Sequence, residues 1–266
     1  MTHMADDGAG SVLVERAAGV ATITLNRPRT KNAMSWPAWD RLSAAVRSVD
    51  PVVDRVVVIT GAGEDFCAGA DLSGAASGRS QLDDMGVLTE LCLALHRLPM
   101  PTIARVDGVA VGAGMNLALV CDFVIASTRA RFSQIFVQRA LSVDFGGSWL
   151  LPRLVGLRRA KELVLLGDII DARRARELGL LHEVVDADKL DAAVADLADR
   201  LASGPRLALR GSKALLNSSL DLTLEQALDN EARTQVISMA SPDITEALEA
   251  FQQRRPANYR ASHEEK

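Results

Sequence analysis

The first half of the chain alternates short apolar runs with turns rich in glycine and alanine. The segments "VLVER" and "VATITLN" flank "AAG" and predict a β-hairpin. "RVVVITG" is a continuous apolar run that ends in glycine, which is typical of a buried strand. "SWPAWDRLSAAVRSVD" instead repeats large apolar residues at helical spacing, through Trp36, Trp39, Leu42 and Val46. The pattern predicts strands and helices in alternation.

Two longer passages look like copies of one supersecondary unit. "VVVITGAGEDFCAGADL" and "TIARVDGVAVGAGMNLAL" each run from an apolar strand into a glycine-rich turn. Between them the pattern predicts a loop over about residues 61–80 and a helix in "LDDMGVLTELCLALHRL". From about Arg153 onward the periodicity is helical. We therefore expect an α/β fold with a core over residues 11–195, a helical region over 196–266 and a disordered N-terminus over 1–10.

Composition and charge exclude several classes of protein. Among 266 residues, 48% are apolar and the net charge is −4, without a basic block, which argues against nucleic acid as a partner. Three cysteines without CxxC spacing indicate reduced thiols. The acidic start lacks the apolar core of a signal peptide, and no apolar run approaches the ~20 residues of a membrane span. We expect a cytoplasmic protein that does not bind membranes.

The glycine-rich turns fit a nucleotide loop poorly. In "GAGEDF", Phe66 stands where GxGxxG requires glycine, and no GxxxxGK[ST] motif occurs. "CAGAD" and "GAGMN" are free of bulky side chains, so they could aim two backbone N–H groups at one oxygen. The alternative is that they simply connect strands to helices. Four scattered histidines form no metal-ligand pattern, so no metal site is expected.

One carboxylate stands out in "FVQRALSVDFGGSWLLPR", where Asp144 lies among apolar residues. Burying an acid there is costly unless the acid is exposed, paired or used in chemistry. Aspartate before Gly146–Gly147 also suits a helix N-cap or a turn. The residues alone leave both interpretations open.

Several motifs together resemble one family. They are "LNRPRTKNAMS", "VVVITGAGEDFCAGADL", "PTIARVDGVAVGAGMNLALVCDFVIAS", "GGSWLLPRLVGLRRAKELVLLGDIIDARRARELGLLHEVV" and the tail "ALEAFQQRRP". The chain resembles the crotonase superfamily, the enoyl-CoA hydratase/isomerase family, over nearly its whole length. The resemblance implies a spiral core of repeated ββα units and a C-terminal helical region for trimerisation, often as a dimer of trimers. It also implies an acyl-CoA thioester substrate, with coenzyme A as part of the substrate and no separate cofactor.

The resemblance also implies which residues form the site. An oxyanion hole of two backbone N–H groups maps to Ala70 and Ala113, where the second position is usually glycine in the family. The remaining correspondences concern coenzyme A. They comprise adenine contacts at Ala68, Asp71 and Leu72, a basic segment near the phosphates at Arg27 and Arg29, and tail positions at Phe251 and Arg254. For the arginines and the tail, a purely structural role is equally expected.

The chain departs from the hydratase pattern at both catalytic glutamates. Those positions hold Asn116 and Phe136, which neither shuttle a proton nor activate water. Asp144 instead falls where isomerase members, such as enoyl-CoA and 1,2-epoxyphenylacetyl-CoA isomerases, carry a single catalytic acid. Val143 and Phe145, with Phe136 and Asn116, would then line a dry acyl pocket in which desolvation raises the basicity of Asp144.

The sequence therefore favours a double-bond isomerase acting on an enoyl-CoA or a related cyclic acyl-CoA. An enoyl-CoA hydratase of fatty acid degradation and a non-catalytic acyl-CoA binder are the alternatives. An aspartate nucleophile of the aryl-CoA dehalogenase type is disfavoured because no histidine precedes Asp144 in its segment. Val143 replaces a proline and Ala140 a frequent glycine of the isomerase pattern, so the backbone path there needs direct observation.

Overall fold

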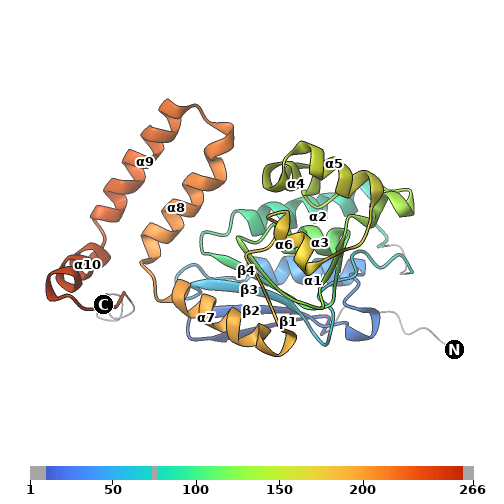
Figure 1. Cartoon of the computed structure of the whole chain (residues 1–266), viewed down its shortest axis with the longest axis horizontal. Coiled ribbons are helices and arrows are strands. Elements are labelled where there is room, and N and C mark those ends of the chain that lie inside the picture. Colours follow the sequence, from blue (N-terminus) through green and yellow to red (C-terminus); the bar gives the residue numbers. More distant parts are fainter. Residues whose placement is uncertain (1–9, 74–76, 260–266) are drawn as a thin grey trace.

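A twisted sheet with strand order β1-β2-β3-β4-β6-β9 forms the centre of the computed structural model, which describes residues 10–73 and 77–259 (Figure 1). Strands β1 and β2 form the expected antiparallel hairpin, closed by Ala18 and Gly19, both at positive φ as a two-residue turn of type I′ requires. The later neighbours pair in parallel. The strands are β1 (Val12–Ala17), β2 (Val20–Leu25), β3 (Val56–Gly61), β4 (Thr102–Val106), β6 (Phe123–Ser127) and β9 (Glu183–Val185).

A second, small sheet explains the repeated passages of the sequence. It has the order β5-β7-β8, with β5 (Val109–Val111), β7 (Arg131–Ser133) and β8 (Ile170–Asp171). Strand β4 leads into β5, and β6 leads into β7. After β3, Cys67 forms a parallel bridge with Ala110 of β5. Three successive units thus run from the large sheet into the second layer, which confirms the repeat and extends it by one copy.

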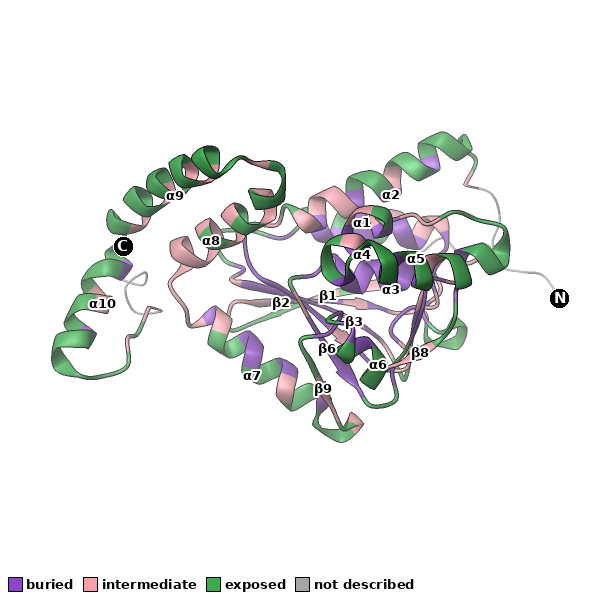
Figure 2. Ribbon diagram, turned by 45° about the horizontal axis from the view of Figure 1, so that its top comes forward, coloured by how far each residue is buried: buried purple, intermediate pink, exposed green. Residues whose placement is uncertain are grey.

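Helices cover both faces of the large sheet (Figures 1 and 2). One face carries α1 (Trp36–Arg47), α2 (Gln81–His96) and α3 (Ala113–Leu119), and most of the buried apolar side chains lie there. On the other face, α7 (Leu190–Ala202) packs against β3, β4 and β6. Trp39, Leu42 and Val46 of α1 are buried, as their helical spacing predicted.

The remaining elements of the core are short. They are the helices α4 (Gly147–Val155), α5 (Leu157–Leu166) and α6 (Ala172–Glu177) and the 3-10 turns η1 (Pro28–Thr30), η2 (Ile135–Arg139) and η3 (Ala187–Lys189). The sequence pattern did not reveal α4, because it starts at a glycine pair and contains Pro152. No described helix combines the length and the apolar character needed to cross a bilayer.

The C-terminal helices form an arm that leaves the core (Figure 1). It consists of α8 (Arg206–Ser218), η4 (Ser219–Asp221), α9 (Leu224–Met239) and α10 (Pro242–Gln253), and no residue of α8 or α9 is buried. The boundary expected near residue 195 falls inside α7, whose Leu197, Ala198 and Ala202 still pack on the sheet. The contacts therefore place the division after Ala202. The α/β class is confirmed, whereas the disorder expected for residues 1–10 concerns positions that, apart from Gly10, lie outside the described residues.

Candidate active site

The two glycine-rich loops run side by side. The amide of Cys67 donates to the carbonyl of Val109 at 2.8 Å, and the amide of Val111 donates to the carbonyl of Cys67 at 3.1 Å. At Gly69, φ is +85°, and a Cβ atom would lie 2.9 Å from the carbonyl oxygen of Val111 and 3.7 Å from the amide nitrogen of Ala113. Only glycine fits such a close approach. The loop that carries Ala70 is thereby pressed against the start of α3.

The amides of Ala70 and Ala113 are both available to a ligand. Ala113 is the first residue of α3, so its N–H has no partner within the helix. Ala70 forms a parallel bridge with Met34, in which the amide of Met34 donates to Gly69 and the amide of Asp71 donates to Met34. The N–H of Ala70 itself takes no part in this bridge. Within the described residues, no hydrogen bond leaves either amide. An oxyanion hole requires two fixed N–H donors of this kind, and this role of Ala70 and Ala113 remains a prediction.

Asp144 lies in the turn before α4. The N-cap of that helix is Gly146 and no side chain caps it, so the cap interpretation of Asp144 is wrong. The carbonyl of Asp144 does accept from the amide of Gly147 at 2.9 Å, which makes it a turn residue. Its side-chain Oδ1 is buried and has no hydrogen-bond partner among the described residues. Burial raises the pKa of the Asp144 carboxyl to about 6.

Helix α3 links the amide of Ala113 to the turn that carries Asp144. Asn116 lies three residues after Ala113, hence on the same side of the helix. Its Nδ2 donates to the carbonyl of Asp144 at 2.8 Å, and its Oδ1 accepts from Nε2 of Gln134 at 2.8 Å. Asn116 is fully buried, and both ends of its amide bind protein groups. Its contact with an acyl group remains a prediction.

The apolar residues around Asp144 are packed as a dry wall. Phe136 is buried, and its ring lies 3.7 Å from where a Cβ atom of Gly112 would stand. Phe145 is buried and stacks on Trp39 with ring centroids 5.5 Å apart. Val143 packs against the same apolar cluster. Such surroundings withhold water from the carboxyl, consistent with the direction of its pKa shift.

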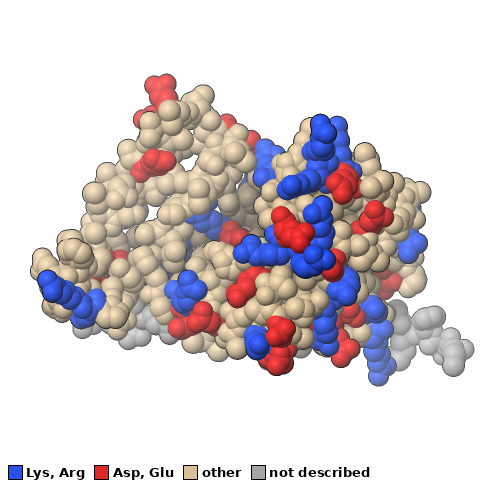
Figure 3. All heavy atoms as spheres, viewed as in Figure 1, with Lys and Arg blue, Asp and Glu red and all other residues tan. Residues whose placement is uncertain are grey.

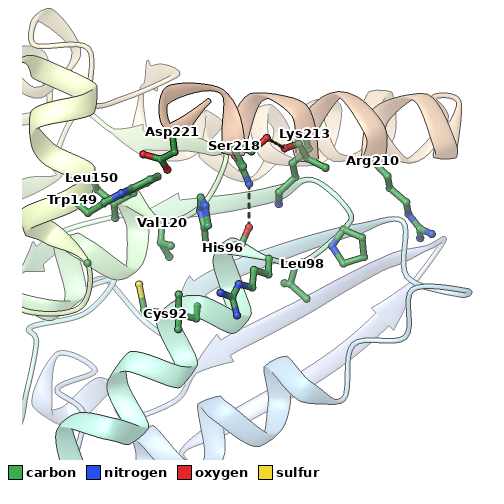
Figure 4. A pocket seen from close by; sticks show the side chains of 16 residues that line it. Cys92, His96, Leu98, Val120, Trp149, Leu150, Arg210, Lys213, Ser218 and Asp221 are labelled. Atoms are coloured by element: carbon green, nitrogen blue, oxygen red, sulfur yellow. Dashed lines mark hydrogen bonds between the residues drawn. The ribbon is translucent and has the colours of Figure 1, made fainter. Parts of the chain in front are cut away.

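A cavity of about 620 Å³ opens next to this wall, between α2, α4 and α8 (Figure 4). Cys92 and Gly146 line it beside Asp144, and the charge of Asp144 contributes, after burial, to raising the pKa of the Cys92 thiol to about 11. At its far side His96 meets the edge of Trp149, with ring centroids 5.3 Å apart. The cavity gives room for an acyl group near the carboxyl.

Five residues expected to contact coenzyme A lie near one another. The amide of Ala68 donates to the carbonyl of Lys31 at 3.0 Å, so the first glycine-rich loop lies against the segment that carries the two arginines. Arg27 pairs with Asp71 at 3.1 Å, whereas Arg29 and Leu72 are exposed. The Ser73 hydroxyl, followed by Arg27, holds the pKa of Asp71 below its usual range.

The two tail residues are not brought to this place within one chain. Phe251 and Arg254 belong to α10 and its C-terminal cap, at the far end of the arm from α1 and α2 (Figure 1). Phe251 is 83% exposed. The described residues also contain no group of three or more His, Cys, Asp or Glu placed to hold a metal ion.

A sequence model of the enoyl-CoA hydratase/isomerase family matches residues 15–262. The chain belongs to this family. Among its relatives, the 1,2-epoxyphenylacetyl-CoA isomerase of Escherichia coli is 38% identical, over 91% of this chain and 95% of the relative. The crotonyl-CoA hydratase of Syntrophomonas wolfei is 34% identical, over 94% of this chain and 97% of the relative. Hydratase names are the more common among the relatives.

Solved structures agree with this membership of the enoyl-CoA hydratase/isomerase family. The crystal structure of an enoyl-CoA hydratase from Bacillus anthracis matches with a TM-score of 0.88 and 32% identity, over 94% of this chain and 98% of the other. A Thermobifida fusca protein solved in complex with CoA matches with a TM-score of 0.82 and 34% identity, over 90% and 96% of the chains. The crotonase-type fold is thus confirmed, and the chain is an acyl-CoA enzyme of the enoyl-CoA hydratase/isomerase family.

Three residues of this site escaped the sequence analysis. Gln134 lies in "FSQIF", between Phe132 and Phe136, and a glutamine in such an apolar segment is itself a sign of an internal hydrogen bond. Trp39 was interpreted as a core residue of α1, and Cys92 as an ordinary thiol. Their contacts to the Asp144 turn cross more than fifty residues of sequence, so no local spacing reveals them.

Proposed function

We propose that this chain is an enoyl-CoA isomerase that moves a double bond with Asp144 as the single proton shuttle. The substrate is an enoyl-CoA, or a related cyclic acyl-CoA, with its thioester oxygen facing the amides of Ala70 and Ala113. The observation that carries the proposal is the carboxyl of Asp144, which is buried, has no partner for Oδ1 among the described residues and has a pKa raised to about 6. A pKa near the working pH suits a group that both takes and returns a proton.

The proposed reaction conserves atoms and electrons. The carboxylate of Asp144 removes a proton from the α carbon of a 3-enoyl-CoA, and the C–H electron pair flows into the thioester to form a dienolate. Two N–H donors stabilise the charge on its oxygen. The dienolate then takes the same proton at the γ carbon, which leaves the double bond between α and β. Phe136 and Phe145 support this chemistry because they keep water away from the intermediate.

The deciding experiment is Asp144→Asn. We expect the variant to bind acyl-CoA as wild type does but to lose exchange of deuterium at the α and γ carbons. Because an amide cannot accept the proton, the loss should be at least about 100-fold, the usual contribution of a positioned general base. Exchange at the wild-type rate would refute the role of Asp144. Tight binding without any exchange in the wild type would favour the non-catalytic binder.

Hydration is the second candidate, and the hydratase names of relatives favour it. Asn116 and Phe136 oppose it, because neither residue is an acid and Asn116 is engaged inside the protein. Purified protein should be offered a 2-enoyl-CoA and a 3-enoyl-CoA in parallel. Water addition to the former at a higher rate than isomerisation of the latter would replace our proposal.

We also propose that the arm mediates assembly into a homotrimer or a dimer of trimers. Its large apolar side chains are exposed in one chain, among them Leu224 (76%), Leu228 (54%) and Val236 (66%) of α9. Figure 3 shows few charged side chains over the same helix. Burying such a surface against another copy is favourable. In an assembly of this kind, Phe251 and Arg254 could serve the coenzyme A of a neighbouring chain.

A further inference from the structure

Two buried amide side chains lie behind the candidate base. Asn116 of α3 and Gln134, just before η2, are both completely buried. Gln134 donates to Asn116 at 2.8 Å, and Asn116 donates to the carbonyl of Asp144 at 2.8 Å. Within the described residues, Gln134 forms no hydrogen bond with Asp144 itself. The two residues form a short chain of hydrogen bonds that ends on the backbone of the base, which we name the Gln134–Asn116 amide pair.

The carbonyl of Asp144 determines how both side-chain amides of this pair are oriented. A backbone carbonyl only accepts hydrogen bonds, so Asn116 must turn its Nδ2 toward Asp144. Its Oδ1 then faces Gln134, which must present Nε2 as a donor. The remaining Oε1 of Gln134 is buried and has no partner within the described part of the chain. An orphaned buried acceptor costs free energy, so this direction of the bonds needs a compensating reason.

The peptide between Asp144 and Phe145 supplies that reason. Phe145 has a φ of +45°, in the left-handed region that bulky residues rarely adopt. Rotating the 144–145 peptide changes ψ of Asp144 and φ of Phe145 together, so the hydrogen bond from Asn116 opposes the relaxation of this strain. Stacking on Trp39 holds Phe145 from its other side. The strain is stored directly beside the base.

The packing around Asn116 requires glycine at position 147. A Cβ atom on Gly147 would lie 2.5 Å from Nδ2 of Asn116 and 2.6 Å from Val143. The glycine therefore allows Asn116 to reach the carbonyl of Asp144 at hydrogen-bond distance. Asn116, Gly147 and the turn at Asp144 fit one another as a unit.

We propose that the Gln134–Asn116 amide pair positions Asp144, by holding the 144–145 peptide in the strained orientation that directs the carboxyl into the active site. The inference rests on the proposed function in so far as Asp144 is the base. It assigns Asn116, at a position where hydratases of the family carry an acid, a positioning role. Gln134 acts through Asn116, two hydrogen bonds away from Asp144.

The pair makes a pH-dependent test available. In Asn116→Asp, an ionised carboxylate accepts from Gln134 but cannot donate to the carbonyl of Asp144, whereas the protonated acid does both. Burial keeps the introduced acid protonated to a higher pH than usual. In Gln134→Glu, an ionised side chain forces the Asn116 amide to turn over and to present its oxygen to Asp144. Gln138→Glu, which removes a bond to Gly167 from the same segment, is the matched control.

The experiment combines kinetics with structure. At pH 8.5 we expect kcat for proton transfer to fall about 100-fold in both variants, because a displacement of the base by about 1 Å costs that much, while KM stays within about threefold. Since Asp144 itself titrates near pH 6, each rate is divided by the wild-type rate at the same pH. For Asn116→Asp this ratio should recover by at least about tenfold at pH 5.5, which a merely destabilised protein would not do. Gln138→Glu should stay within about twofold of wild type.

Crystal structures of Asn116→Asp at both pH values separate this proposal from the proposed function. A 144–145 peptide that turns away at pH 8.5 and returns at pH 5.5 supports the amide pair, even if the enzyme proves to catalyse another reaction. An unchanged peptide at both pH values overturns it. If Asn116→Asp does not fold, Gln134→Met removes the donor without adding charge, and an unchanged 144–145 peptide there overturns the proposal equally.

Discussion

At the scale of single residues, the carboxyl of Asp144 is the group on which function and stability make opposite demands. Its pKa rises from 3.8 to about 6 because folding buries it, and its Oδ1 has no hydrogen-bond partner among the described residues. A structural aspartate would show the reverse, a pKa lowered by bonds to its ionised form. Asp71 of the first glycine-rich loop is such a case, because Ser73 and Arg27 hold its pKa low. This contrast is what the proposed catalytic role of Asp144 leads us to expect.

The raised pKa of Asp144 predicts that Asp144→Asn stabilises the protein at alkaline pH. The folded protein carries no penalty below pH 3.8, where the carboxyl is protonated in both states, and acquires the penalty as the pH rises from 3.8 to about 6. The difference corresponds to at most about 3 kcal/mol. In urea unfolding, the free energy of unfolding of Asp144→Asn should therefore exceed that of the wild type at pH 8 and lie close to it at pH 4. The exposed Asp168→Asn is the control, and a gain independent of pH would contradict the prediction.

The same ionisation predicts the pH dependence of the reaction. The base must be ionised to accept a proton, so kcat/KM should fall about tenfold for each pH unit below about 6 and level off above it. Rates of double-bond shift between pH 4.5 and 8.5 would measure this. A flat profile across pH 6 would exclude Asp144 as the general base.

Sequence alone selected Asp144 as the candidate base but did not predict the residues that hold it. Its isolation among apolar residues and its place in a family motif were both visible in one segment. Trp39, Cys92 and Gln134 reach it from α1, α2 and the start of η2, and only the fold brings those elements together. The sequence shows that Asn116 stands where hydratases of the family carry an acid. Its hydrogen bond to the carbonyl of Asp144 depends on the orientation of its amide, which residue spacing does not encode.

At the scale of secondary-structure elements, the start of α3 offers a way to remove one N–H donor alone. Proline is tolerated at the first position of a helix, where the N–H has no helical partner. Ala113→Pro should therefore keep the fold but lower kcat by about 100- to 1000-fold, as the loss of an oxyanion donor does. Ala113→Gly, which retains the amide, should stay near wild type. Circular dichroism and steady-state kinetics together would check this, and a fully active proline variant would remove Ala113 from the oxyanion hole.

At the scale of the whole molecule, the helical half was predicted in outline but its attachment was not. The periodicity of the C-terminal third predicted helices. It did not show that α7 packs on the core and that α8 extends away from it. Lys213 of α8 fixes this junction, through bonds to Asp122 at 2.6 Å and to the carbonyl of Met100 at 2.9 Å. Asn217 adds a bond to the carbonyl of His96 at 3.2 Å (Figure 4). These long-range contacts have no signature in any single segment.

For the arm beyond that junction, we predict that one substitution prevents assembly without preventing folding. Leu224, Leu228 and Val236 follow one another after four and eight residues, so they lie on one side of α9 as a stripe that another copy would bury. Leu228→Lys places a charge in the stripe, whereas Asp229→Lys alters the neighbouring exposed position. By sedimentation, Leu228→Lys should shift the protein from trimer or hexamer to monomer, and Asp229→Lys should not. Because burying an unpaired charge costs several kcal/mol, the shift should persist at micromolar concentration. An unaltered oligomer of Leu228→Lys, or a wild-type monomer, would show that α9 does not mediate assembly.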